Sequence, residues 1–268
     1  MAEQYQAAQY GTQLFRNGTM LPFGVAFVSE DTVFRDYGPL SGKTTRLAYD
    51  VSPKIGSTLS RQTLDLDARW YQRLAGNGVA AFRLKGFRSW GDYPDFFYFG
   101  GNSEMRGYDY LSFIGNEGFF GNAELRFPLV EAMLTPIGVL GGIRGIFFAN
   151  VGAAHFYQQE QATYGYKFAT SQRETYKSLV NVDCSVQTLD GQCTPIYKDV
   201  NISGFRLRDG RASYGVGLES FILGFPIHFD FSWRTLFNKS WEDALFATDG
   251  GSSKFRKPQF NVWIGYDF

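Results

Sequence analysis

Stretches in which bulky apolar residues alternate with polar or charged ones dominate this sequence. Between residues 227 and 234 the chain reads IHFDFSWR. The same period of two recurs at residues 45–51, 64–71, 122–129 and 260–268. Successive side chains of an extended strand point to opposite faces, so each stretch predicts a strand with one apolar and one polar face. No segment has a convincing 3.6-residue helical period. The sequence therefore predicts an all-β fold.

The alternation divides the chain into a series of predicted strands. They lie at about residues 24–33, 43–52, 60–74, 79–90, 118–130, 139–156, 211–222, 225–237 and 259–268, with a weakly patterned further strand at 5–15. Short turns such as residues 76–78 join some neighbours, as in antiparallel hairpins, whereas the links at 91–117, 157–210 and 238–258 are long. Short turns alternating with long loops are typical of an outer-membrane barrel.

Alternation also fits a soluble sandwich or a lipocalin, in which the apolar face points inward. Three features favour the inverted arrangement with the apolar face outward. Aromatic residues gather near the strand ends, as in the girdles of membrane barrels. Full charges such as Asp67, Glu124 and Arg126 occupy mid-strand positions, which suits a wet lumen. The strands also exceed the roughly 5–6 residues usual in soluble proteins. We therefore predict an antiparallel transmembrane β-barrel.

Composition limits the partners and the compartment. Lys and Arg together number 26, as do Asp and Glu, so the net charge of zero gives no reason to expect nucleic acid. No run approaches the ~18 apolar residues of a membrane-spanning helix. The first ten residues, MAEQYQAAQY, lack the features of a signal peptide. The chain is therefore either cytosolic or a mature or truncated part of an exported protein.

The only cysteines, Cys184 and Cys193, flank the polar stretch SVQTLDGQ. In an oxidising compartment a pair this close can form a disulfide within one loop; the alternative is two unrelated thiols. No nearby histidine or further cysteine completes a four-ligand zinc site. Asp183 and Asp190 lack the spacing of a calcium loop, so no metal site is predicted.

Three patterns that are found in catalytic or nucleotide-binding sites have simpler interpretations here. Residues 41–44, SGKT, end like a phosphate loop, but Tyr37 stands at the position of the first glycine and no helix follows, which favours a hairpin turn. His228 and Ser232 share a strand face without a third orienting group, which favours lumen lining over a membrane-embedded hydrolase. Asp65 and Asp67 share a face with Arg69 and predict a neutralised patch. No catalytic residue or cofactor is predicted.

Six short motifs occur in the order found in one family. They are FGGNSEMRGY at residues 99–108, ELRFP at 124–128, FFANVG at 147–152, GVGL at 215–218, the strand through 225–231, and the terminal Phe268. Together they resemble the C-terminal part of the bacterial surface antigen family, the BamA/TamA-like outer-membrane barrels, over about residues 24–268. Because family barrels have sixteen strands, the resemblance implies that the single barrel domain of residues 1–268 is part of a larger barrel or a short form.

The resemblance also implies a function without covalent chemistry. Such a protein assists the insertion, assembly or translocation of unfolded outer-membrane or secreted proteins through a lateral seam in a Gram-negative outer membrane. Its partners are outer-membrane lipid, these clients and periplasmic accessory subunits, with no cofactor and no nucleic acid. The alternative is a passive pore or an anchor for an N-terminal periplasmic partner domain.

Two groups of residues carry the expected site. The resemblance implies that the loop at 91–117 re-enters the lumen, with 157–210 a long surface loop. The loop brace comprises Gly100, Gly101, Arg106, Gly107, Tyr108, Glu124 and Asn150. Arg106 is expected to bind Glu124 and to donate one hydrogen bond to Asn150, where the family usually has Asp. The C-terminal strand signal comprises Phe260, Val262, Ile264, Tyr266 and Phe268.

Overall fold

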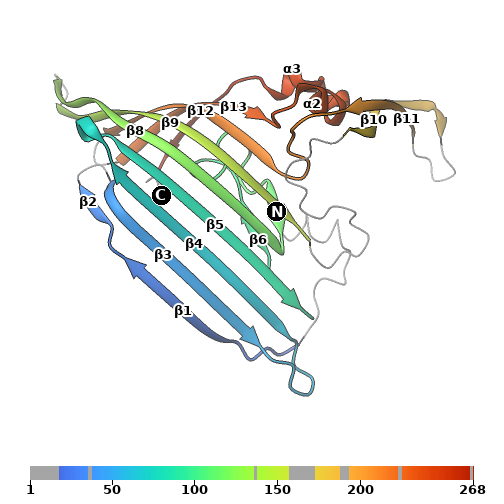
Figure 1. The fold of residues 1–268 in the computed structure, drawn as a ribbon, viewed down its shortest axis with the longest axis horizontal. Helices are drawn as coiled ribbons and strands as arrows, with labels where there is room; N and C mark the ends of the chain where they lie inside the picture. Colours follow the sequence, from blue (N-terminus) through green and yellow to red (C-terminus); the bar gives the residue numbers. More distant parts are fainter. Residues whose placement is uncertain are drawn as a thin grey trace.

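One antiparallel sheet, whose strands follow the chain order, forms most of the molecule (Figure 1). The computed structural model describes residues 18–35, 38–135, 138–156, 173–187, 193–222, 225–265 and 268. The sheet runs β1 (Phe23–Glu30), β3 (Gly38–Ser52), β4 (Arg61–Arg73), β5 (Val79–Gly91), β8 (Glu117–Thr135), β9 (Gly138–His155), β12 (Arg211–Ile222), β13 (Phe225–Thr235) and β14 (Gln259–Ile264). A short strand, β2 (Val33–Arg35), pairs with β3 beside this path.

The prediction of an all-β antiparallel fold is confirmed. Each of the nine main predicted strands corresponds to a strand of the sheet, while the weak prediction at 5–15 lies outside the described residues. The sheet is not closed, because among the described residues β1 pairs only with β3 and β14 only with β13. Every pairing along the path is antiparallel, so the two edge strands run in the same direction.

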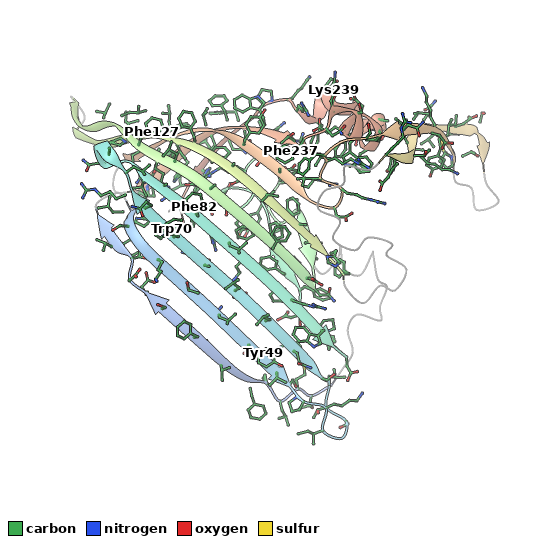
Figure 2. All side chains as sticks on the ribbon, in the orientation of Figure 1. Tyr49, Trp70, Phe82, Phe127, Phe237 and Lys239 are labelled. Atoms are coloured by element: carbon green, nitrogen blue, oxygen red, sulfur yellow. A yellow bond between two sulfur atoms is a disulfide. The ribbon has the colours of Figure 1, made fainter. Side chains whose placement is uncertain are left out.

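The two faces of the sheet differ sharply in chemistry. On β13, Phe231 is 45% exposed, whereas its neighbour Asp230 is 1% exposed. The outer face carries exposed apolar side chains, among them Leu47, Leu64, Trp70, Phe82, Leu125, Phe147, Tyr214 and Phe260. Trp70 and Phe82 stack across β4 and β5 (Figure 2). The inner face carries buried polar groups, among them Asn122, Glu124, Arg126, Asn150, His228 and Asp230. This is the reverse of a soluble sandwich and matches the predicted orientation.

The connections also differ between the two ends of the sheet. At one end the links are short, as at η2 (Ala75–Asn77) between β4 and β5. At the other end, here called the loop end, are the links 92–116, 156–210 and 236–258. The link 92–116 contains two short paired strands, β6 (Phe97–Phe99) and β7 (Phe113–Gly115). Its Phe99 and Met105 are fully buried against Phe120 of β8, so this loop packs on the inner face.

The other two loop-end links contain regular structure that the sequence did not predict. The expected surface loop 157–210 includes a hairpin of β10 (Glu174–Gln187) and β11 (Cys193–Ile202). The link after β13 contains α2 (Lys239–Leu245), η3 (Ala247–Asp249) and α3 (Gly251–Phe255). α2 has seven residues and α3 has five, so both are too short to show a helical period in the sequence. Asn238 caps α2 by accepting a hydrogen bond from the Trp241 amide.

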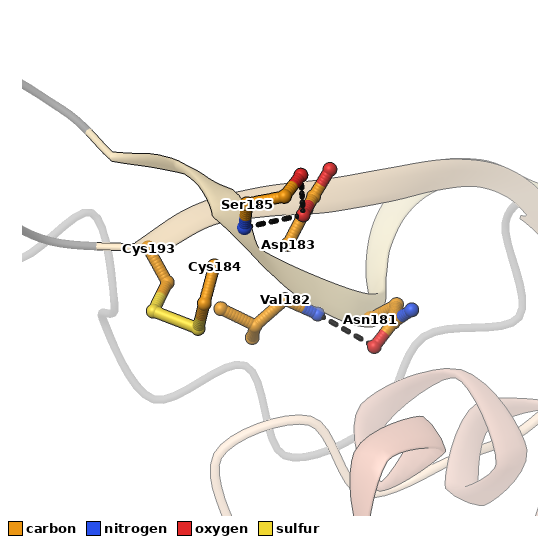
Figure 3. The surroundings of a disulfide bond; sticks show 6 residues. All are labelled: Asn181, Val182, Asp183, Cys184, Ser185 and Cys193. Atoms are coloured by element: carbon orange, nitrogen blue, oxygen red, sulfur yellow. Dashed lines mark hydrogen bonds between the residues drawn. A yellow bond between two sulfur atoms is a disulfide. The ribbon is translucent and has the colours of Figure 1, made fainter.

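Hairpin and helices share one small apolar core. Trp241 of α2 is buried with Ile202, Leu207, Leu236 and Phe255. Its indole nitrogen donates to the Leu207 carbonyl at 2.8 Å. At the tip of the hairpin, Cys184 and Cys193 form a disulfide (Figure 3). None of the described helices is long and apolar enough to cross a bilayer.

Candidate functional site

Three glycines give the loop 92–116 its path on the inner face. Gly100 and Gly101 have φ angles of +138° and +76°, and Gly107 has +86°. Side chains other than glycine rarely adopt these angles. At Gly107 an added Cβ would also lie 2.8 Å from the Ser232 hydroxyl oxygen on β13. The backbone directly after Arg106 therefore lies against β13.

Arg106 lies between two carboxylates that come from different strands. Its Nη1 is 2.5 Å from Glu124 Oε1 on β8, and its Nε is 3.2 Å from Asp230 Oδ2 on β13. All three side chains are at most 1% exposed. The guanidinium carbon also lies 4.5 Å from the centre of the Phe148 ring. Arg106 thus joins the loop to β8, β9 and β13 through ionic and cation–π contacts.

A second arginine balances the charge of this cluster. Arg126 Nε donates to Glu124 Oε2 at 2.8 Å, so Glu124 binds one arginine with each oxygen. Trp263 of β14 donates from its indole nitrogen to Asp230 Oδ2 at 2.7 Å. The cluster therefore holds two cations and two anions. A buried charge is tolerated when it is paired and hydrogen-bonded, and this arrangement meets that condition.

Asn150 lies on the inner face as expected, but its hydrogen-bond partners are other than Arg106. Its side-chain oxygen accepts from Asn122 at 2.8 Å, and its side-chain nitrogen donates to the Ser213 hydroxyl at 3.0 Å. Asn122 also donates to the Glu104 backbone carbonyl in the loop. Asn150 therefore supports the loop through Asn122, and Asp230 supplies the second partner of Arg106. Because Asp230 neutralises the arginine, a further acid at position 150 is unnecessary.

Tyr108 anchors the far side of the Arg106 turn. Its hydroxyl donates to the Ala212 carbonyl at 3.0 Å at the start of β12, and its ring packs edge-on against Phe113. Burial raises the pKa of the Tyr108 phenol, so this group remains a hydrogen-bond donor at neutral pH. The Arg106 turn is therefore fixed on both sides.

Further along the inner face, opposite charges neutralise one another on β3, β4 and β5. Asp67 lies 2.9 Å from Arg83 and 3.0 Å from Arg69. Asp65 lies 2.8 Å from both Arg46 and Lys85. Each acid thus has two cationic partners, so both carboxylates are neutralised, while the four cations exceed the two acids of this group.

The C-terminal signal residues separate into two groups. Phe260, Val262 and Ile264 of β14 are 53–65% exposed on the outer face, as expected, and Tyr266 lies outside the described residues. Phe268 does not continue their face: it is 5% exposed and packs with Tyr71, Val79 and Ala81 of β4 and β5 on the inner face. Its carbonyl oxygen accepts from Arg126 at 3.3 Å. The alternation that puts Phe260, Val262 and Ile264 on the outer face therefore does not extend to Phe268.

Comparison with protein families gives one match that spans nearly the whole chain. The Omp85 superfamily domain matches residues 16–268. The chain belongs to the Omp85 superfamily. Omp85 proteins are outer-membrane barrel proteins that act in protein assembly and translocation. The resemblance predicted from the six motifs is therefore confirmed at the level of this superfamily. A comparison with curated protein sequences gave no significant match.

In this Omp85 protein, the side chains considered for other chemistry have structural partners. His228 Nε2 is 2.9 Å from the Gly265 carbonyl oxygen, and its ring stacks on Trp263 with 3.7 Å between centres. The Ser232 hydroxyl points to the Gln259 carbonyl oxygen, 3.5 Å away. Among the described residues, no group of three or more His, Cys, Asp or Glu side chains could hold a metal ion.

Sequence reasoning missed the role of Asp230 and Trp263 in the Omp85 site. The alternation placed Asp230 on the inner face, and it is the only acid in the described residues of β13. The inner-face position of Asp230 was the signal in the sequence that could have identified it as a partner of Arg106. The two residues are far apart in the chain, so the sequence offers no reason to pair them.

Proposed function

We propose that this Omp85 protein assists the insertion or translocation of protein clients at a Gram-negative outer membrane, in the manner of BamA and TamA, without enzymatic chemistry. The observation that carries the proposal is the edge of the sheet at β14. This strand has six residues, beside eleven in β13. Unpaired backbone groups are costly in lipid, so such an edge favours the addition of a client strand by β-augmentation.

The path of the chain after β14 supports a seam at this edge. The Gly265 amide still donates to the Pro226 carbonyl at 3.2 Å, but Phe268 packs on the inner face of β4 and β5. Within the described residues, β14 pairs with β13 on one side, and no strand pairs with its other side. That unpaired side is where an incoming strand would add.

The loop 92–116 supports an assembly role over a passive pore. It packs on the inner face through Met105, Phe99 and the ion pairs of Arg106. A loop held there obstructs a wide aqueous channel. The same contacts link the loop to Trp263 on the edge strand through Asp230, so the loop and the seam share one carboxylate.

A crosslinking experiment tests the seam directly. A photoreactive residue replaces Val262 on β14 or, as the matched control, Val216 on the interior strand β12; both valines are on the outer face, 53% and 39% exposed. The full chain in liposomes is supplied with an unfolded barrel precursor. We expect crosslinks to the precursor from position 262 only. Equal crosslinking from both positions would contradict a specific seam.

The same liposomes distinguish the alternative function. Folding of the precursor, measured by its protease resistance, should depend on the protein. Ion conductance without any acceleration of precursor folding would favour the passive pore or anchor for a periplasmic partner domain. The assembly proposal also includes periplasmic accessory subunits, and adding them should raise the rate of precursor insertion further.

A further inference from the structure

Three cationic side chains converge on one cavity at the loop end of the sheet. The cavity has a volume of about 300 Å³ and is lined by Arg211 of β12, Arg234 of β13 and Lys254 of α3. Tyr108 of the inner-face loop forms a further part of the wall. The cavity therefore lies where the loop, two sheet strands and the helices after β13 meet.

Among the described residues, these cations lack the ion-paired carboxylates that Arg106 and Arg206 have; Asp209 acts on Arg211 without forming an ion pair with it. Arg211 Nη1 donates to the Gly210 carbonyl at 3.0 Å, and Arg234 Nε donates to the Phe255 carbonyl at 3.1 Å. Within the described part of the chain, neither arginine nor Lys254 forms an ion pair. By contrast, Arg106 pairs with Glu124, and the fully buried Arg206 pairs with Glu174.

Aromatic rings hold the two guanidinium groups in place instead. The guanidinium carbon of Arg211 lies 5.8 Å from the Phe246 ring centre, and that of Arg234 lies 5.0 Å from the Phe255 centre. The two phenylalanines stack on each other at 4.4 Å. Cation–π contacts orient a guanidinium without neutralising it. One acid, Asp249, lines the cavity and is exposed, so the cavity holds three cations and one anion.

We propose that this cavity binds a phosphate-bearing anion. Guanidinium groups match phosphate oxygens with paired N–H donors, and the exposed Lys254 adds a point charge at the rim. The cavity volume admits a phosphate or pyrophosphate group with a small substituent. Because Tyr108 lies two residues from Arg106, a bound anion connects the inner-face loop to β12, β13 and α3. The site does not depend on the proposed function.

Titration calorimetry on the full chain in detergent micelles tests the site. The probes are inorganic phosphate and pyrophosphate; the lipid arm measures binding of the chain to phosphatidylcholine vesicles with and without phosphatidic acid. Lys254→Gln and Arg211→Gln each remove one cation. A hydrogen bond to a charged group contributes about 1.5–3 kcal/mol to the binding free energy. We therefore expect the Kd for the probe that binds to rise at least about tenfold in each variant.

The matched control is Lys257→Gln, which removes one charge from an exposed side chain three residues from Lys254 and outside the cavity wall. Its Kd should equal that of the parent protein. Binding of phosphate or pyrophosphate identifies a soluble ester as the source, and binding only to vesicles with phosphatidic acid identifies a lipid headgroup. The absence of binding to every probe, or the same loss in Lys257→Gln as in Lys254→Gln, would overturn the proposal.

Discussion

Arg106 Nε of the inner-face loop lies 3.2 Å from Asp230 Oδ2 of β13. The same carboxylate oxygen accepts the indole N–H of Trp263 on the edge strand at 2.7 Å. One buried oxygen thus joins the loop, the penultimate strand and the strand at the open edge. A displacement of the loop therefore changes the contacts of Trp263 on β14, and a displacement of β14 changes those of Arg106.

Removing the charge of Asp230 is expected to destabilise the protein strongly. Asp230→Asn removes one of the two carboxylates that lie against the buried Arg106. Breaking a buried ion pair costs about 3–5 kcal/mol. The measurement is thermal unfolding of the purified protein in detergent. Asp95→Asn, which removes an exposed acid 3.7 Å from Arg61, is the control and should cost less than about 1 kcal/mol.

Asn150→Asp tests the charge balance of the cluster by adding an acid to it. Asn150 holds Asn122 and Ser213, and Glu124 and Asp230 already neutralise Arg106 and Arg126. A third buried acid should therefore lower stability by roughly 1–3 kcal/mol. A more stable Asn150→Asp protein would show that Arg106 requires a further anion.

Glu124→Ala should lower heat resistance far more than Glu117→Ala. The Glu124 side chain is fully buried and binds both Arg106 and Arg126. Glu117 is 20% exposed, and its partners Arg88 and His155 both lie 3.7 Å away. We expect a loss of about 3–5 kcal/mol for Glu124 and about 1 kcal/mol or less for Glu117. The temperature at which the folded band disappears in gel electrophoresis measures both. Equal shifts would refute the role of Glu124 as the loop brace.

Phe268→Ala should destabilise the refolded protein more than Phe260→Ala. Phe268 is 5% exposed and packs on Tyr71, Val79 and Ala81, whereas Phe260 is 55% exposed on the outer face. Truncating a buried phenylalanine costs about 3–5 kcal/mol. The comparison uses chemical unfolding of protein refolded in detergent, which separates stability from assembly in the cell. A larger loss for Phe260 would contradict the inner-face docking of Phe268.

Glu104 should make the protein less stable as the pH rises. Burial raises the pKa of Glu104 above its ordinary value of 4.5, although the Gly100 amide, which donates to Oε2, lowers it. The folded protein therefore holds a proton that the unfolded chain releases at lower pH. Its stabilising effect is complete below pH 4.5 and is lost as the pH rises through the raised pKa. The Glu104→Gln variant should unfold at a higher temperature than the parent above that pKa, with the difference shrinking in acid.

Reduction of the disulfide should have a local effect. Cys184 and Cys193 are nine residues apart at the tip of the β10–β11 hairpin. Closing a loop of this length stabilises by about 2–3 kcal/mol in the chain-entropy description. The paired Cys184→Ser and Cys193→Ser variant should therefore be cleaved faster by protease within residues 174–202. The heat resistance of the sheet should be unchanged, and a large fall would show that the hairpin core supports the strands.

Much of this architecture follows from local patterns in the sequence. A period of two fixes which side chains share a face, so residues 227–234 alone indicate an aromatic outer face and a polar inner face. Charges such as Asp67 and Arg83 in mid-strand are compatible only with an inner face where they can pair. The glycines at 100, 101 and 107 likewise mark the turn that presents Arg106.

Local sequence patterns suffice to predict the strands, their two faces and the position of Arg106 in its loop, because each depends on neighbours within a few residues. Long-range packing makes Asp230 the second partner of Arg106, turns Phe268 to the inner face and brings three cations to one cavity. These contacts join segments far apart in the chain. Their formation depends on how the sheet curves and where the loops pack, which no local period encodes.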